Sequence, residues 1–431
     1  MRITSITAGA SGMYCGSCIR DNALAAALTR RGHDVTLLPL YTPTRTDEEN
    51  VSQKRVFFSG ISVYLEEYVS LFRWTPWLLD RLWESPWLLR LVSGRMKTDP
   101  GQLGGLTVSM LEGTHGHQRK ELDKLVHWLR DQPRPDVIDI SNSMLIGIAE
   151  PLKQALGGPV NCTLQGENIF LGHLPEPYRS RAVALIREQV AHVDSFVAVS
   201  DYYAGCMSRY LEIPGAKMHV VPLGVDVDRF RPGDRASAGA VTLGYFGRMA
   251  PEKGIHRLCD AYAALRGRGE LGGCRVELAG YLGPEHEEYW RSVERTNAGR
   301  DLAGDIHYRG ELALDEKVAF LQGLDLFVVP AEYDDPKGLS LIEAMACGVP
   351  VVAPRRGTYT ELVERTGGGV LVEPENAAAL EQALVALAAD PERRAELGRR
   401  AVEGVRARYG TDEMTARALD VYARLTAGAG A

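Results

Sequence analysis

Two positively charged side chains lie in the glycine-bounded segment Gly247-Arg-Met-Ala-Pro-Glu-Lys-Gly254. The segment follows an apolar run of strand length and precedes an amphipathic run of helix length, so it is predicted to be a loop at the carboxyl end of a strand. The Arg248 guanidinium can fork onto phosphate oxygens, and the Lys253 ammonium adds a compact charge. The pattern therefore predicts a diphosphate site; the alternative is a solvated pair on the surface.

A second segment carries residues that could bind a ligand or take part in chemistry: Tyr333-Asp-Asp-Pro-Lys-Gly-Leu-Ser-Leu-Ile-Glu-Ala-Met-Ala-Cys-Gly-Val-Pro350. A strand ending at Val329 leads through an acidic loop into a helix that starts near Gly338. The first N–H groups of a helix have no partner within it and attract anions. The amides near Leu339 and Ser340 are therefore candidates for a second contact to phosphate.

Two carboxylates accompany that helix. Glu343 lies about one turn into it and can accept hydrogen bonds from the paired hydroxyls of a ribose. Asp335 precedes the helix and can bond sugar hydroxyls. The structural alternative for Glu343 is a carboxylate placed favourably near the positive end of the helix dipole.

Strands and helices alternate along the whole chain, which predicts parallel sheets with crossover helices. In the first half, a helix is expected from Ser17 to Arg31, and strands are expected at Ile3–Thr7, Val35–Leu40, Val137–Ile140, Val160–Leu164, Phe196–Val199 and His219–Pro222. In the second half, strands are expected at Val241–Phe246, Arg275–Ala279, Ile306–Tyr308, Leu326–Val329, Val349–Ala353 and Val370–Val372. Helices are expected there near 254–268, 285–297, 314–323, 339–347, 358–365 and 376–389, with two more in the tail from Pro391 to Leu425.

The fold class predicted is α/β, with two doubly wound, Rossmann-like domains facing across a cleft, where small ligands tend to bind. A polar, Gly-rich segment at 224–239 is interpreted as the linker. The predicted domains are residues 1–235 and 236–410, followed by a C-terminal helix in 411–431 that packs back near the first domain. A Trp-rich segment at 61–96 is predicted to be a helical insertion in the first domain.

Composition narrows the class of protein. The 431 residues carry a net charge of -7 and a pI near 5.9, which argues against a nucleic-acid-binding surface. The first residues predict a short strand without the apolar core of a signal peptide, and no apolar run is long enough to span a membrane. Seven cysteines, an odd number, do not make a disulfide framework. A cytoplasmic protein with reduced thiols is expected.

The two chemical segments resemble the retaining glycosyltransferases of family 4, which have the two-Rossmann GT-B fold. That family carries a Gly-Arg…Glu-Lys-Gly loop, then an acid-x7-acid pattern running into Glu-Ala-Met-Ala-x-Gly-x-Pro-Val-Val. Here the acids are Asp335 and Glu343, and Ala344-Met-Ala-Cys-Gly-Val-Pro-Val-Val352 follows. Further matches are Val221-Pro-Leu-Gly-Val-Asp226 with Phe230 and Pro232, Glu361 in Gly357-Thr-Tyr-Thr-Glu361, Val197-Ala-Val-Ser200, and Arg31-Gly-His-Asp-Val35.

The resemblance implies a role for each residue of the site. Arg248 and Lys253 would bind the donor diphosphate, Glu343 the ribose, Asp335 the transferred sugar, and Glu361 would support the nucleoside end. The backbones of Gly16, Gly247, Gly338, Leu339 and Ser340 would approach the donor closely. The reaction implied is front-face transfer of a hexose-type sugar from a nucleotide-diphosphate donor with retention, without a cofactor or a metal. In such a site, preorganised cations stabilise the phosphate charge that develops as the donor bond breaks.

Three positions depart from the family pattern. Asp335 is one methylene shorter than the commoner Glu, and Lys337 stands where Phe is frequent. Lys337 could add a contact to sugar or phosphate. Gln165, in Thr163-Leu-Gln-Gly-Glu-Asn168, takes the place of a histidine. A glutamine cannot exchange protons near neutral pH, so the expected role of Gln165 is to position the sugar or the acceptor.

Four weaker signals have competing interpretations. Cys15-Gly-Ser-Cys18 resembles a redox motif, but the same loop is expected to approach donor and acceptor through Gly12 and Gly16. Gly9-Ala-Ser-Gly12 lacks the acidic residue that a dinucleotide site would place after the second strand. Asp226-Val-Asp228 imitates a metal-binding Asp-x-Asp, but capping of a turn is favoured. His115 and His117 are interpreted as surface or capping residues.

Two other functions compete with sugar transfer: a sugar-nucleotide epimerase on a similar fold, and a non-catalytic subunit that binds a sugar nucleotide. The acceptor is expected to be a carbohydrate, a lipid-linked sugar or a small molecule. The insertion at 61–96 includes Trp74, Trp77, Trp83 and Trp87 with interspersed arginines. Helices of that kind can lie in a membrane interface, so peripheral contact with the inner membrane face is a hypothesis, and packing onto the first domain's own sheet is the alternative.

Overall fold

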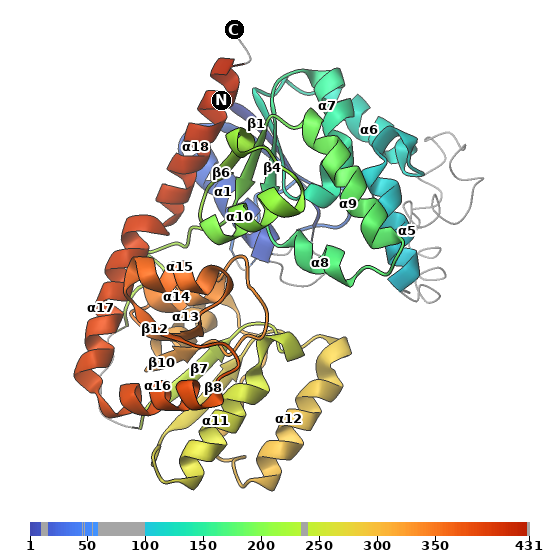
Figure 1. The fold of residues 1–431 in the computed structure, drawn as a ribbon. Coiled ribbons are helices and arrows are strands. Elements are labelled where there is room, and N and C mark those ends of the chain that lie inside the picture. The colour runs from blue at the N-terminus through green and yellow to red at the C-terminus, as the bar shows by residue number, and fades with distance from the viewer. Residues whose placement is uncertain are drawn as a thin grey trace. The chain divides into compact units, whose positions relative to one another are not determined.

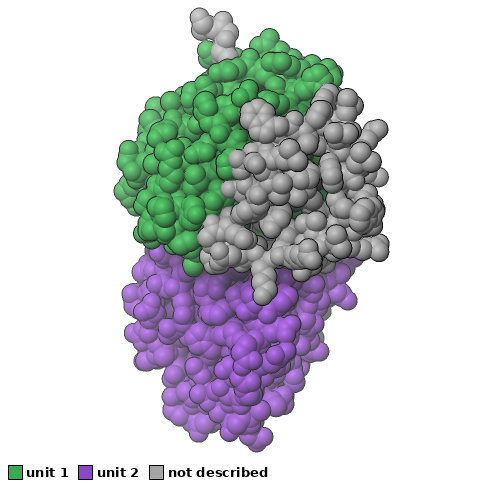
Figure 2. Space-filling model, turned by 90° about the vertical axis from the view of Figure 1, so that its right-hand side faces the viewer, with its two compact units in different colours: residues 1–199, 203–221, 415–431 green, residues 200–202, 222–414 purple. Residues whose placement is uncertain are grey.

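The computed structural model describes residues 1–9, 16–44, 46, 48–53, 55–58, 100–233 and 240–428. These residues form two compact units, which Figure 2 shows in green and purple. Unit 1 comprises Met1–Val199, Tyr203–Val221 and Thr415–Ala431, and unit 2 comprises Ser200–Tyr202 and Pro222–Met414. The predicted insertion at 61–96 lies outside the described residues.

Unit 1 contains a six-stranded sheet in the order β2-β1-β3-β4-β5-β6, in which every pairing is parallel (Figure 1). Its strands are β1 (Arg2–Thr7), β2 (Asp34–Pro39), β3 (Val137–Ile140), β4 (Val160–Leu164), β5 (Ser195–Ala198) and β6 (Met218–Val220). Its helices are α1 (Gly16–Arg30), α5 (Pro100–Leu111), α6 (Arg119–Arg130), α7 (Ala149–Leu156), α8 (Glu167–His173), α9 (Tyr178–Gln189) and most of α10 (Asp201–Tyr210).

Unit 2 contains a second six-stranded parallel sheet, in the order β12-β11-β10-β7-β8-β9. Its strands are β7 (Thr242–Phe246), β8 (Arg275–Ala279), β9 (Ile306–Tyr308), β10 (Leu326–Val328), β11 (Val351–Pro354) and β12 (Gly369–Val372). Its helices are α11 (Ile255–Gly267), α12 (Glu287–Gly299), α13 (Leu314–Gln322), α14 (Leu339–Ala346), α15 (Gly357–Thr366), α16 (Ala377–Ala389) and α17 (Pro391–Arg408). Each predicted strand is confirmed to within one or two residues at its ends, as is the doubly wound α/β class.

Alternation along β7 explains how this sheet is covered on both faces. Leu243 and Tyr245 point into a core shared with α11, α12 and α16, where Trp290 and Leu384 are buried. Gly244 faces the other way, and a Cβ there would lie 2.2 Å from the side chain of Leu324. Since side chains on a strand alternate between faces, β7 delivers Phe246, its last residue, to the face that α13 covers.

The division between the units follows Val221, whereas the sequence interpretation placed it at residue 235. Residues after Val221 pack with unit 2: Val225 forms a β-bridge with Gly410, and Phe230 is buried. Asp226 accepts hydrogen bonds from the N–H groups of Asp228 and Arg229, which is the turn-capping role favoured from the sequence. The last helix, α18 (Thr411–Gly428), belongs to unit 1 from Thr415 onward.

Candidate active site

The candidate donor site lies where the strand order of unit 2 reverses direction. β7 and β10 are neighbours in the sheet. From β7 the chain passes through α11 to β8 on one side, and from β10 it passes through α14 to β11 on the other side. Open parallel sheets bind ligands at the carboxyl ends of such strands. Parallel pairing brings together the two loops that the sequence singled out, 247–254 after β7 and 329–338 after β10.

These two loops touch at Gly254. Its φ of +69° lies in the left-handed region, and a Cβ there would lie 2.0 Å from the carbonyl oxygen of Pro330. Only glycine fits both the backbone conformation and the space. Beside this contact the N–H of Glu332 donates to the carbonyl oxygen of Glu252 at 2.9 Å. The first glycine-bounded loop is therefore anchored directly on the second.

Across this junction Lys253 meets Asp335. The ammonium Nζ lies 3.1 Å from Oδ2 of Asp335 and also donates to the hydroxyl of Tyr333. The Lys253 side chain is 18% exposed and lies over the Tyr333 ring, with Nζ 4.6 Å from the centroid. Two residues that the sequence assigned separately, to the diphosphate and to the sugar, thus form one ion pair.

Donors surround the Asp335 carboxylate. Oδ1 accepts the N–H groups of Lys337 at 2.8 Å and Gly338 at 3.1 Å. Oδ2 accepts from Lys253 and from the hydroxyls of Tyr333 and Tyr359, the latter at 3.0 Å. Burial alone would raise the pKa of Asp335, but the Lys253 charge and these hydrogen bonds outweigh it and hold the pKa well below its usual value. Asp335 therefore stays ionised and fixes its neighbours.

Tyr333 and Tyr359 are site residues that the sequence analysis missed. Burial and the nearby Asp335 charge raise the pKa of both phenols, so both keep their protons as donors. The available signal was Tyr333 itself, the first residue of the acidic segment, which could reach a carboxylate two positions ahead. Tyr359 comes from α15 and carried no local signal.

Arg248 has a different environment. Its side chain is 46% exposed and pairs with Glu252 of the same loop. The hydroxyl of Tyr245 donates to the Arg248 carbonyl oxygen at 3.0 Å, which fixes the backbone while the guanidinium remains accessible. The adjacent Gly247 is crowded, because a Cβ there would lie 2.7 Å from the same hydroxyl. Arg248 is thus an accessible cation on a supported loop.

The predicted helix start near Gly338 is confirmed: Gly338, with a φ of +66°, caps α14, which begins at Leu339. Leu339 and Ser340, both half-buried, occupy its first turn, where backbone N–H groups lack intrahelical acceptors. Glu343 lies one turn further on and is 4% exposed. Its Oε1 is 2.5 Å from Nζ of Lys317 in α13, a buried partner that the sequence analysis did not identify.

The remaining two candidates of unit 2 are Lys337 and Glu361, and each contacts the backbone or side chains of other residues. Lys337 is half-buried, and its backbone N–H binds Asp335. Glu361, in α15, accepts the N–H groups of Asp201 and Tyr202 at 3.3 and 2.8 Å and lies 3.8 Å from the guanidinium of Arg365. Burial raises the Glu361 pKa against these contacts. Its carboxylate caps the start of α10.

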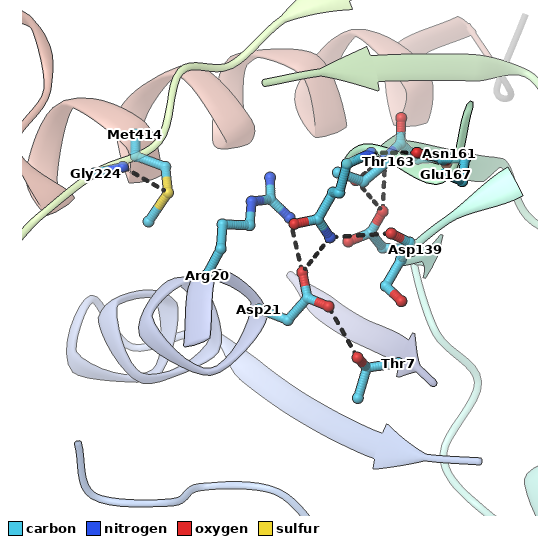
Figure 3. Close-up of polar contacts among 11 residues, drawn as sticks. Thr7, Arg20, Asp21, Asp139, Asn161, Thr163, Glu167, Gly224 and Met414 are labelled. Carbon is cyan, nitrogen blue, oxygen red and sulfur yellow. Dashed lines mark hydrogen bonds and ion pairs between the residues drawn. The ribbon is translucent and has the colours of Figure 1, made fainter. Parts of the chain in front are cut away.

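Unit 1 contains a separate buried polar cluster where its own strand order reverses, between β1 and β3 (Figure 3). Gln165 follows β4 and is 3% exposed. Its Nε2 donates to Oδ1 of Asp21 and to the carbonyl oxygen of Ser141, both at 2.9 Å. Both amide protons are therefore used, and Oε1 is left without a partner among the described residues. Gln165 presents a hydrogen-bond acceptor.

Asp21 is the centre of this cluster. It also accepts from the Thr7 hydroxyl at 2.9 Å and pairs with Arg20 at 3.2 Å, and all three side chains are buried. Burial raises the pKa of Asp21 to about 6, assisted by the charge of Asp139 and opposed by that of Arg20. A carboxyl group that can change its protonation near neutral pH therefore lies directly behind Gln165.

Some predicted features cannot be compared with the structure. Gly16 begins α1, but Cys15 and Gly12 lie outside the described residues; Cys18 is buried. In the described part of the chain no three His, Cys, Asp or Glu side chains are arranged to hold a metal ion. None of the helices described there is long and apolar enough to cross a membrane.

Two family models match the chain. One, described as glycosyl transferases group 1, covers residues 227–403 and includes the loops of the candidate donor site. The other, described as glycosyltransferase family 4, covers residues 107–229, most of which belong to unit 1.

Curated relatives carry the name D-inositol 3-phosphate glycosyltransferase. The protein of Salinispora tropica is 30% identical over 356 residues, which cover 76% of this chain and 71% of the relative. That of Saccharomonospora viridis is 33% identical over 274 residues, 58% of this chain and 60% of the relative. That of Segniliparus rotundus is 30% identical over 316 residues. The chain thus spans 60–66% of the length of the last two relatives.

Solved structures show the same fold. Sucrose-phosphate synthase from Thermosynechococcus elongatus has a TM-score of 0.71 at 18% identity, covering 99% of this chain and 100% of that one. Anabaena HepE in complex with UDP has a TM-score of 0.70 at 17% identity with the same coverage. With the fold, the two family models and the Salinispora tropica relative in agreement, the chain belongs to the family 4 glycosyltransferases of the GT-B fold.

Proposed function

We propose that this glycosyltransferase takes a hexose-type sugar from a nucleotide-diphosphate donor held by unit 2, retains the configuration at the anomeric carbon and needs no divalent metal. The observation that carries the proposal is the junction at Gly254. It brings the loop that bears Arg248 and Lys253 beside the start of α14, at the carboxyl ends of β7 and β10. Two cations and a helix N-terminus at one sheet edge suit a diphosphate.

We assign the proposed role of each side chain from its exposure and its contacts. Arg248, the accessible cation, and Lys253, held by Asp335, bind the diphosphate together with the first amides of α14. Glu343 accepts hydrogen bonds from the ribose, and Lys337 and Asp335 border the sugar. Relatives by fold give the class of ligand to test first, since Anabaena HepE was solved with UDP and with UDP-glucose.

The proposed reaction is a front-face substitution. The bond between the anomeric carbon and the diphosphate oxygen breaks, the acceptor oxygen bonds to the same face, and the acceptor proton passes to the leaving phosphate. The protein's main task is then to stabilise charge developing on the diphosphate, which preorganised cations do without reorganisation. Gln165, as a hydrogen-bond acceptor, can orient a hydroxyl of the sugar or of the acceptor.

The acceptor is proposed to be a carbohydrate, a lipid-linked sugar or a small molecule with a free hydroxyl. D-Inositol 3-phosphate is the first candidate to assay, because the curated relatives are named for it. Peripheral membrane contact through residues 61–96 remains a separate proposal. Binding of the protein to liposomes, before and after substitution of Trp74 and Trp77 by Ala, tests it.

The experiment is a calorimetric panel of UDP-, GDP- and ADP-sugars, each with EDTA and with Mn²⁺, followed by assays with the bound donor and D-inositol 3-phosphate. Binding and turnover that persist in EDTA, with a product of the donor's anomeric configuration by proton NMR, support the proposal. Loss of donor binding in EDTA contradicts metal independence. Incubation of the donor alone is the control: a changed sugar without acceptor would indicate an epimerase.

A further inference from the structure

A buried ion pair joins Glu343 of the proposed donor site to Lys317, a residue that the family resemblance did not identify. Nζ of Lys317 in α13 is 2.5 Å from Oε1 of Glu343 in α14, and each side chain is only 5% exposed. Lysine and glutamate are rarely buried unless they are paired. Lys317 and Glu343 therefore depend on each other to be buried as charged side chains.

Aromatic side chains surround the cation of this pair. Lys317 Nζ lies 5.2 Å from the ring centroid of Phe246 and 5.3 Å from that of Phe230. Rings at this distance attract an ammonium group through their faces. Phe246 is the last residue of β7, so these contacts place the ion pair at the sheet edge where the cationic loop begins.

Stability alone gives a weak reason for such a pair. Removing two charges from water costs about as much as their attraction returns, and hydrophobic replacements of buried pairs are often neutral or stabilising. Removing one partner is different, because it leaves an uncompensated charge. An acidic residue that must stay ionised inside the protein, however, requires a counter-ion at a fixed position.

We propose that Lys317 is a positioning residue for donor recognition: it keeps the Glu343 carboxylate ionised and oriented so that it accepts hydrogen bonds from the ribose hydroxyls. This inference rests on the proposed function, in which Glu343 binds the ribose. Lys317 itself acts through Glu343 and the rings of Phe230 and Phe246. It therefore sets the preference for a ribose over a deoxyribose and does not act on the diphosphate.

The test is calorimetric affinity for UDP, GDP and ADP, each compared with its 2′-deoxy counterpart. For the nucleotide that binds, the wild type is expected to prefer the ribose form by about tenfold or more, the scale of one hydrogen bond to a charged group. Lys317→Met should bring this ratio close to one and leave affinity for the 2′-deoxy form nearly unchanged. Lys317→Arg should restore most of the preference.

Matched variants separate positioning from folding. Glu343→Gln should lose the preference as Lys317→Met does, and adding Lys317→Met to it should change the ratio no further. Lys153→Met, which breaks the half-exposed pair with Asp194 in unit 1, should leave the ratio unchanged. If Lys317→Met does not fold, Lys317→Met with Glu343→Met replaces both charges by apolar groups and should fold with a ratio near one.

The outcomes distinguish the two proposals. A folded Lys317→Met protein that keeps the full ribose preference overturns the inference and leaves the proposed function standing. A wild type that binds nucleotides without any preference overturns the ribose role of Glu343 and the inference with it, while donor binding stands. A wild type that binds none of these nucleotides contradicts the proposed function itself.

Discussion

Gln165 and Asp21 are 144 residues apart in the sequence, yet Nε2 of Gln165 lies 2.9 Å from Oδ1 of Asp21. The contact brings the amide that replaces the family's histidine against a buried carboxyl group. Because Nε2 also donates to the Ser141 carbonyl, the orientation of the amide is determined by two acceptors. Protonation of Asp21 therefore changes the charge directly beside the Gln165 amide.

The raised pKa of Asp21 predicts a pH-dependent stability. Its pKa rises from 3.8 in the unfolded chain to about 6 in the folded protein. Below about pH 4 both states hold the proton; between about pH 4 and 6 only the folded state does, so stability falls as the pH rises. A shift of this size corresponds to about 3 kcal/mol in the free energy of unfolding, and this contribution is fully lost above pH 6.

Asp21→Asn removes this titration. Measured by urea denaturation, its stability relative to the wild type should rise by up to about 3 kcal/mol between pH 4 and pH 7. Subtracting the two proteins cancels the titration of every other group. Thr7→Val, which removes a hydrogen bond that favours the ionised form, should move the transition of the wild-type curve to higher pH. A pH-independent difference between Asp21→Asn and the wild type would show that Asp21 is ionised normally.

Gly254→Ala should disrupt the donor site. The added methyl would lie 2.0 Å from the Pro330 carbonyl oxygen, so the two loops must separate. Gly269→Ala is the matched control, since Gly269 has a φ of +73° and open space around it. Both variants bear the cost of a left-handed alanine, roughly 1–2 kcal/mol. Gly254→Ala alone should also lose nucleotide affinity; equal affinity in the two variants would contradict the role of the junction.

Arg248→Ala and Lys253→Ala should each lower kcat by about 10²–10³, the scale for losing one electrostatic donor in a preorganised site. Arg248 is half-exposed, so the fold should survive its loss, whereas Lys253→Ala leaves the buried Asp335 without its counter-ion and should also destabilise unit 2. Arg291→Ala, which removes an exposed arginine paired with Glu287 on α12, controls for the loss of a positive charge. Steady-state kinetics with the donor chosen by the calorimetric panel provide the measurement. Near-normal turnover of a folded Arg248→Ala, Lys253→Ala double variant would contradict the proposed role of the two cations in binding the diphosphate.

Asp335→Ala should destabilise unit 2 by about 3–5 kcal/mol, because it leaves Lys253 without its counter-ion. The neighbouring Asp334→Ala, at an exposed carboxylate 3.5 Å from Arg356, should change stability by less than about 0.5 kcal/mol. Melting temperatures compare the two variants.

Binding of a nucleotide without its sugar separates two roles for Asp335. If Asp335 acts by holding Lys253, Asp335→Asn should weaken binding of the bare nucleoside diphosphate. If it touches only the transferred sugar, affinity for the bare nucleotide should hold while affinity for the nucleotide sugar falls. The many donors around its two oxygens favour the first result.

The sequence by itself determined the elements and the loops that carry the chemistry. Apolar runs such as Val137–Ile140 became buried strands, and the glycine after Lys253 ended a loop where predicted, because these signals depend on residues a few positions apart. The order of segments, each following a strand and preceding a helix, also placed the cationic loop and the start of α14 at the same edge of a sheet.

The tertiary structure alone decided which side chains meet at the sheet edges within each unit. Lys253 with Asp335, Lys317 with Glu343, and Asp21 with Gln165 come from segments 82, 26 and 144 residues apart. No local pattern specifies such pairs, because they depend on the strand order of each sheet and on the helix that covers each face. Burial then turns them into strong interactions, since charges removed from water must find partners within the protein.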